Sequence, residues 1–156
     1  MLIMKRIYTL IAILCFIYNS EAQSYEYQVI TSVESIIPSG AGRSRLVSTN
    51  ENRNYKDFTS VRTDGKTVKD KRNKSDRSDI RVKNFEETKL LNFYNIAGIR
   101  FQNIAANDAV ITSKINTMTE EGWELAFVTS AVESDAGKND GRGIFITRYI
   151  FKKLKE

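Results

Sequence analysis

The stretch 108-DAVITSKINTMTEEGWELAFVTSAV-132, continued by 144-IFITRYIFKK-153, decides the fold of this chain. Asp108 is a suitable helix N-cap, because its carboxylate can accept a hydrogen bond from a free backbone N–H group of the first turn. Apolar residues then recur at i, i+4 and i+7 as one helical stripe, formed by Ile111, Ile115 and Met118. Gly122 ends the helix, since glycine adopts the left-handed conformation without strain. The stretch therefore predicts one helix over 108–121 that leads directly into a pair of strands.

Both predicted strands are apolar on two faces. In the first strand, alternation places Trp123, Leu125, Phe127 and Ala131 on one face and Ala126, Val128 and Val132 on the other. In the second strand, it sets Ile144, Ile146 and Ile150 against Phe145, Tyr149 and Phe151. Strands of this kind need cover on both faces. We therefore expect either a helix on each face, or a partner or second copy over the face that a helix leaves free.

Towards the N-terminus, the segment 24–33 alternates in the same way and predicts a half-buried strand. One face consists of Tyr25, Tyr27, Val29, Thr31 and Val33, and the opposite face of Glu26, Gln28 and Ser32. A shorter strand is expected over 45–49.

A second helix is predicted over 84–97. Asn84, with Glu87 three residues later, resembles a capping box. Apolar residues follow near helical spacing, namely Phe85, Leu90, Leu91, Tyr94 and Ala97. Gly98 is suited to end this helix, and the segment 99–106 fits either a short strand or a packed loop.

Together these elements predict an α+β fold, in which a small antiparallel sheet of three to four strands is packed with two helices and carries a long polar insertion. We expect residues 23–156 to form a single domain. The insertion around 50–83 is expected to be mobile, because it is too polar to bury the surface that would offset its ordering entropy.

Basic residues are concentrated in 62–83, in a chain with a formal net charge of +5. The candidate anion-binding residues are Lys69, Lys71, Arg72, Lys74 and Arg77. They suit an anionic polymer or a membrane surface, whereas the interspersed aspartates suit a solvated loop without a ligand. Nucleic acid is disfavoured as a partner, since no aromatic residue lies between Phe58 and Phe85 to stack on bases.

Residues 1–22 have the organisation of a secretory signal peptide. Lys5 and Arg6 precede an apolar core over 7–18, and Ser20-Glu21-Ala22 supplies the small residues that cleavage requires. The apolar run is shorter than the roughly 20 residues that span a bilayer, so no transmembrane span is expected after cleavage. The expected location is periplasmic or extracellular.

Composition limits the possible chemistry. The chain has no histidine and a single cysteine, Cys15, which lies within the predicted leader. Cysteine catalysis, imidazole bases and ordinary zinc sites are therefore not expected, and we predict no catalytic residue, metal or cofactor. A hydrolase that uses carboxylates alone would need a concave pocket holding two of Glu26, Glu124, Glu133 and Asp135.

Two local features have a functional and a structural interpretation. Trp123 is either a ligand-stacking side chain or a core residue that fixes the helix against the sheet, and its place on an apolar face favours the core. The acidic loop 133–141 contains glycines but lacks the spacing of a calcium loop, so a surface hairpin loop is favoured.

Three fragments in this order resemble a small bacterial family, domain of unknown function 4177. They are Tyr25-Glu26-Tyr27-Gln28-Val29-Ile30, Glu121-Gly122-Trp123-Glu124-Leu125 and Tyr149-Ile150-Phe151-Lys152-Lys153. The resemblance implies a short antiparallel sheet packed on a helix, and it covers the two ends of the mature chain. It implies no activity and assigns no functional residue.

The leading functional hypothesis is an exported, non-enzymatic binding or interaction module of the cell envelope, with a protein partner or a second copy as its target. The alternative is a binder of anionic polymer or membrane surface through 62–83. A carboxylate-dependent hydrolase is the third hypothesis.

Overall fold

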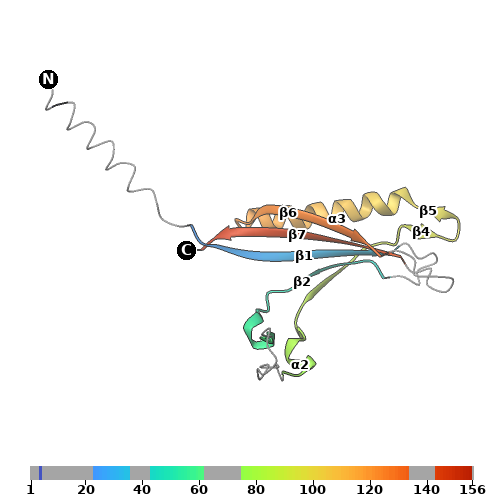
Figure 1. The fold of residues 1–156 in the computed structure, drawn as a ribbon. Helices are drawn as coiled ribbons and strands as arrows, with labels where there is room; N and C mark the ends of the chain where they lie inside the picture. The colour runs from blue at the N-terminus through green and yellow to red at the C-terminus, as the bar shows by residue number, and fades with distance from the viewer. Residues whose placement is uncertain (1–3, 5–22, 36–42, 62–74, 134–142, 156) are drawn as a thin grey trace.

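The computed structural model of the chain describes residue 4 and residues 23–35, 43–61, 75–133 and 143–155. The elements are β1 (Tyr25–Ser35), β2 (Arg45–Ser48), the 3-10 helix η2 (Tyr55–Phe58), α2 (Arg77–Ile80), β3 (Glu86–Lys89), β4 (Tyr94–Asn95), β5 (Gly98–Ile99), α3 (Phe101–Glu120), β6 (Glu124–Val132) and β7 (Ile144–Leu154). A five-stranded antiparallel sheet has the order β3-β2-β1-β7-β6, and β4 and β5 form a separate pair. Figure 1 shows α3 running along one side of the strands. The predicted α+β class is confirmed, with more strands than expected.

The centre of the sheet is the pair β1 and β7. Their register runs from Tyr25 opposite Leu154 to Ser35 opposite Ile144. Both strands are rich in β-branched and aromatic residues, which pack well on a pleated surface. Segments from the two ends of the described chain therefore lie side by side and form the base for α3 (Figure 1).

α3 covers one face of this sheet through a small apolar core. The buried members of the core are Ile30, Leu46, Leu90, Ile111, Met118 and Phe151. Val110, Ile115, Trp123, Leu125 and Tyr149 pack against them and are partly buried. The core therefore includes the predicted helical stripe and Trp123, whose interpretation as a core residue agrees with these contacts.

α3 covers the more polar of the two faces predicted for β1. The residues predicted to share the more polar face include Ser32, which is buried together with its neighbour Ile30. Tyr27 and Val29, which lie on the apolar face, are exposed. Alternation correctly identified the two faces, but it could not show which of them α3 covers.

A β-bulge overturns the faces predicted for β6. Leu125 is opposite Phe151, whereas Phe127 is opposite Ile150, with the register shift between them. Opposed residues project from the same face of a sheet, so the bulge sends Leu125 and Phe127 to opposite faces. The predicted common face for these residues is wrong, because the alternating pattern does not reveal an extra residue.

α3 begins at Phe101 rather than at Asp108, so the predicted start of this helix is also wrong. The segment 99–106, expected as strand or loop, supplies β5 and the first turns of α3. Alanines at 105 and 106 favour the helix here. The predicted end is confirmed: α3 stops at Glu120, and Gly122 has a φ of 87°.

The helix predicted over 84–97 is not formed. Glu86–Lys89 instead pair with Arg45–Ser48 as β3, and Gly98, with a φ of 114°, belongs to the β4–β5 pair. β2 pairs with β1 through one edge, and its other edge is left free to pair with β3. Pairing at this second edge outweighs the local helical signal of the sequence. This edge strand and the separate pair account for the additional strands.

The insertion between β2 and β3 projects from the sheet on the side away from α3 (Figure 1). Its described parts include η2 and α2, so the expected loop contains short helical turns. The predicted turn at Asp64-Gly65 lies outside the described residues.

Candidate interaction surfaces

The sheet face turned away from α3, which we call the open face, carries apolar side chains in register across β1, β7 and β6. One row consists of Val29, Ile150 and Phe127, which are opposed across the three strands. A second row consists of Val33, Ile146 and Ala131. Tyr27 precedes Val29 by two residues and so lies on the same face. Between these two rows lies a polar row, Thr31, Arg148 and Thr129, in which Arg148 is exposed. The open face therefore carries two apolar rows with one cationic side chain between them.

Solvent reaches the aromatic and aliphatic groups of this surface. The exposed fraction is 61% for Tyr27, 43% for Val29 and 67% for Phe127. Single exposed apolar residues are ordinary, but a contiguous group on one sheet face is typical of a contact surface.

Ion pairs flank the open face at two corners. Lys152 lies opposite Tyr27 in the register, and its ammonium group is 3.2 Å from a carboxylate oxygen of Glu124. The hydrogen bond with Glu124 raises the pKa of Lys152, and the Glu124 charge adds to the effect. At the other corner Arg45 pairs with Glu87. These two ion pairs thus lie at the border of the surface, whereas Arg148 places one positive charge between its two apolar rows.

A groove of about 380 Å³ borders the open face where the insertion leaves the sheet. Tyr27 and Val29 line one side of it, Trp123 also contributes, and residues 49–52 line the other side. The Gln28 side-chain amide donates a hydrogen bond to Asn50 Oδ1 at 2.9 Å, which ties the insertion to β1 beside the groove. The surface is therefore concave, and not flat, at this border of the open face.

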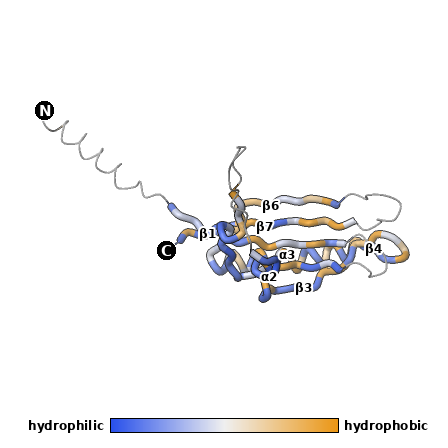
Figure 2. The backbone as a smooth tube through the Cα atoms, turned by 60° about the horizontal axis from the view of Figure 1, so that its bottom comes forward, coloured by the Kyte–Doolittle hydropathy of each residue, from blue (hydrophilic) through white to orange (hydrophobic). Residues whose placement is uncertain are grey.

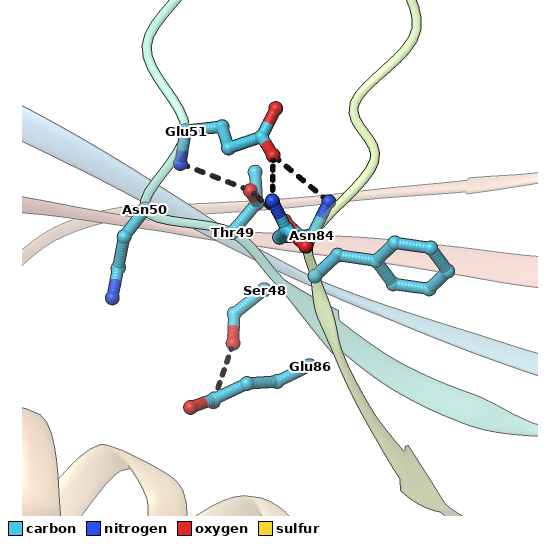
Figure 3. Close-up of a pocket in the computed structure, with 7 residues that line it drawn as sticks. Ser48, Thr49, Asn50, Glu51, Asn84 and Glu86 are labelled. Carbon is cyan, nitrogen blue, oxygen red and sulfur yellow. Dashed lines mark hydrogen bonds between the residues drawn. The ribbon is translucent and has the colours of Figure 1, made fainter.

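The base of the insertion is held by the carboxylate of Glu51 (Figure 3). Glu51 Oε1 accepts hydrogen bonds from the backbone N–H of Asn84 at 2.9 Å and from its side-chain amide at 2.6 Å. Glu51 Oε2 accepts from Arg53 at 2.6 Å. Partial burial raises the pKa of Glu51, but the hydrogen bonds from Arg53, Asn84 and Lys83 outweigh it, and the pKa is lowered overall.

A cavity of about 380 Å³ lies beside this network, lined by Ser48, Thr49, Asn50, Glu51, Asn84, Phe85 and Glu86. Its two carboxylates are both engaged by protein groups. Glu86 accepts from Ser48 at 3.0 Å and from Lys114 at 2.9 Å, and the Lys114 bond is the main reason that its pKa is lowered. We therefore assign this cavity to the fixation of the insertion.

Beneath α3 lies a cluster of buried polar groups centred on Asn107. This side chain is only 1% exposed. Its oxygen accepts from the backbone N–H of Leu91 at 2.7 Å, and its nitrogen donates to Leu91 O at 2.8 Å and to Glu34 Oε1 at 2.9 Å. Asn107 therefore joins α3, β1 and the segment after β3. Nothing in the amphipathic pattern of the sequence marked it.

The same cluster perturbs Glu34 and Tyr149. Burial raises the pKa of Glu34; the Asn107 hydrogen bond opposes this change and the nearby Asp108 carboxylate adds to it. Burial also raises the pKa of the Tyr149 hydroxyl, with a smaller lowering by Ser32 and smaller raising effects of Glu34 and Asp108. The Ser32 hydroxyl is buried and, within the described ranges, has no partner in hydrogen-bond geometry.

The candidate anion-binding residues fall mostly outside the described residues, namely Lys69, Lys71, Arg72 and Lys74. Arg77 is described, as an exposed residue in the first turn of α2. Its neighbours Asp76 and Asp79 form the cap of that helix, with Asp76 N bonded to Asp79 Oδ2 at 3.0 Å. The described end of the basic segment therefore has mixed charge.

The carboxylates considered for hydrolysis do not meet in the cavities described above. Glu26 lines the groove beside the open face without Glu124 or Glu133. Glu124 pairs with Lys152, and Asp135 lies outside the described residues, as does most of the acidic loop 133–141.

The described part of the chain contains no group of three or more Cys, Asp or Glu side chains that could hold a metal ion. Within the same ranges, no helix combines the length and apolarity required to cross a bilayer. Comparison with known proteins matches this chain to no family model, to no curated protein and to no solved structure.

Proposed function

We propose that this protein is a non-enzymatic binding module of the cell envelope and that it holds a partner protein against the open face. The observation that carries the proposal is the apolar row Val29–Ile150–Phe127 on the open face, in which Val29 and Phe127 are exposed and Ile150 is half-buried. Burying such side chains contributes roughly 25 cal/mol per Å² of apolar surface, so a partner that covers the row gains a large part of its binding energy there.

The surroundings of the row suit a protein partner. The cores of protein interfaces are apolar and aromatic, with charged groups at the rim. The open face shares much of this arrangement, because Tyr27 and Phe127 lie within it and the pairs Lys152–Glu124 and Arg45–Glu87 lie at its border. Arg148 adds one positive charge between its two apolar rows. The groove beside Tyr27 and Val29 adds a recess for a side chain of the partner.

The predicted leader and the resemblance to domain of unknown function 4177 are consistent with this proposal. The leader over 1–22 motivates the placement in the envelope, periplasmic or extracellular. The resemblance motivates the interpretation as a small sheet-and-helix module, and it brings no activity with it.

The test is photo-crosslinking in the intact envelope of the producing cell. A photoreactive amino acid at position 29 is expected to give a protein adduct of defined mass, whereas the same probe at Thr112, exposed on α3, is expected to give none. Ile150→Lys should abolish the adduct from position 29 without changing the midpoint of thermal unfolding by more than a few degrees. An equal yield from both probe positions, or no adduct at position 29, would contradict the proposal.

A second candidate function is the binding of an anionic polymer or membrane surface through 62–83. The observation that favours it is the projection of the insertion away from the sheet, which carries Arg77 and Arg81 out into solvent (Figure 1). Binding should then weaken steeply with added salt. The triple variant Lys71→Glu, Arg72→Glu and Lys74→Glu should release the protein from anionic vesicles or polysaccharide, and unchanged retention would refute this function.

A further inference from the structure

The two edges of the main sheet differ in their protection against strand pairing. β3 forms one edge with only four residues, Glu86–Lys89, of which three are charged. Glu86 and Glu87 are held in ion pairs with Lys114 and Arg45. Short, charged edge strands of this kind discourage pairing with another chain.

β6 forms the other edge and lacks these devices (Figure 2). It has nine residues, contains neither lysine nor proline, and carries one charge, Glu124, at its start. Its residues from Phe127 to Val132 are all exposed, so α3 leaves this part of the strand uncovered on both faces. Among the described residues, no backbone hydrogen bond outside the β6–β7 ladder involves any residue of β6.

We propose that the outer edge of β6 pairs with β6 of a second copy of this chain, antiparallel about a two-fold axis, so that the two sheets become one. This pairing goes beyond the proposed function, since it uses the edge of the sheet and not the open face. Closed two-fold dimers are also the commonest form of self-association.

Charge selects the antiparallel arrangement. Because the one charged residue of β6 lies at its first position, antiparallel pairing places each Glu124 near the C-terminal end of the other strand, where Glu133 follows Val132, and puts no two carboxylates of β6 directly opposite each other. A parallel arrangement would place the two carboxylates side by side and would repel. The remaining residues, from Leu125 to Val132, are apolar or hydroxylic and can oppose one another without conflict.

The position of the cavities favours a second copy over an unrelated extended peptide. Peptides that add to a sheet edge gain affinity from main-chain hydrogen bonds and specificity from pockets for alternate side chains. The cavities lined by Glu51, Asn92, Trp123, Lys155 and Thr112 respectively include no residue of β6. In the self-pair, by contrast, Phe127 and Val128 each gain neighbours on their own face, and the row Val29–Ile150–Phe127 continues into the second copy.

The test uses site-directed disulfide formation, which this chain permits because Cys15 is its only cysteine. In a Cys15→Ser background, Val128→Cys and Thr129→Cys place one thiol on each face near the centre of β6. Across an antiparallel pair the Cα atoms lie about 4.5–5.5 Å apart, within reach of a disulfide. Mild oxidation should therefore link at least one of these variants into dimers, whereas Thr88→Cys on the β3 edge should remain monomeric.

Sedimentation of the purified chain provides the second measurement. The unmodified protein should sediment as a dimer, Val128→Lys should shift it to a monomer by placing a charge on the edge strand but not on the open face, and Thr88→Lys should leave the dimer unchanged. A monomeric unmodified protein, or equal cross-linking from Thr88→Cys, would overturn the inference. Loss of the dimer in Val29→Lys but not in Val128→Lys would also overturn it, because the open face would then be the contact. These experiments use the purified chain without any partner protein. Their outcomes are therefore independent of whether position 29 forms an adduct in the envelope.

Discussion

An antiparallel sheet with one face in water usually has an apolar covered face and a polar exposed face. The two faces of this sheet depart from that pattern. The face under α3 buries Ser32 beside a small apolar core and meets the buried Asn107 of α3, whereas the open face leaves Tyr27 and Phe127 in solvent. The covered face thus includes buried polar groups, of which Asn107 is hydrogen-bonded to Glu34 and Leu91. Stability and recognition are thus divided between the two faces: the covered face determines whether the chain folds, and the open face has apolar area left for a partner.

Two phenylalanines on neighbouring strands provide the sharpest test of this division. Phe151 in β7 is 0% exposed, and Phe127 in β6 is 67% exposed. Phe151→Ala should lower the free energy of unfolding by about 3–5 kcal/mol, because it removes a ring from a packed core and leaves a cavity. Phe127→Ala should change it by less than about 0.5 kcal/mol.

Denaturant titration of both variants would measure this difference. Equal losses of stability would break the comparison, since they would mean that the open face is packed in the isolated protein. A large loss in Phe151→Ala alone would support it.

The next largest loss of stability is expected from the polar groups of the covered face. Asn107→Ala removes the partner of both backbone groups of Leu91 and of Glu34, so the free energy of unfolding should fall by about 2–3 kcal/mol. Asn116→Ala, at an exposed position of the same helix, is the matched control and should have an effect within about 0.5 kcal/mol.

Thermal unfolding of both variants would give the values. If Asn107→Ala were as stable as the control, the buried polar cluster would contribute nothing to the free energy of unfolding. The stability of the covered face would then come from its apolar core alone.

A smaller effect is expected at the turn that folds the chain back from α3 onto the sheet. Gly122 has a φ of 87°, a conformation that costs an L-residue with a side chain about 1 kcal/mol. Gly122→Ala should therefore lower the free energy of unfolding by about that amount, and Glu121→Ala, at the exposed helix cap, by less than about 0.5 kcal/mol. Equal values would show that the turn adapts without strain.

Features set by local sequence could be predicted, whereas features set by contacts between distant segments could not. β1, β6, β7 and the end of α3 were predictable, because alternation, helical spacing and Gly122 are local signals. The covered face was not, because the choice between two faces of β1 depends on where α3 packs. The bulge after Leu125 and the pairing of Glu86–Lys89 with β2 also depend on partners distant in sequence. The open face was foreseen only as a strand surface lacking cover, and the Asn107 cluster had no sequence signal at all.

The smallest expected effect concerns the pH dependence of the covered face. Burial raises the pKa of Glu34 above its ordinary value of 4.5, so the folded state binds a proton at this site more readily than the unfolded chain does. Stability from this group is therefore greatest below that value and falls as the pH rises through the raised pKa. Glu34→Gln cannot ionise and keeps an oxygen that can accept the Asn107 hydrogen bond. The stability of the variant relative to the original protein should thus increase from about pH 4.5 upwards and then level off.

Glu26→Gln is the matched control, since Glu26 lies in the same strand, eight positions earlier and on the same side of its pleat, but is exposed. Urea titrations between pH 4 and pH 8 would separate the two variants. If the stability difference between Glu34→Gln and the original protein did not change with pH, the Glu34 carboxylate would be as well solvated in the folded state as in the unfolded state. The packing of α3 on the sheet beside Asn107 would then be looser than its burial indicates.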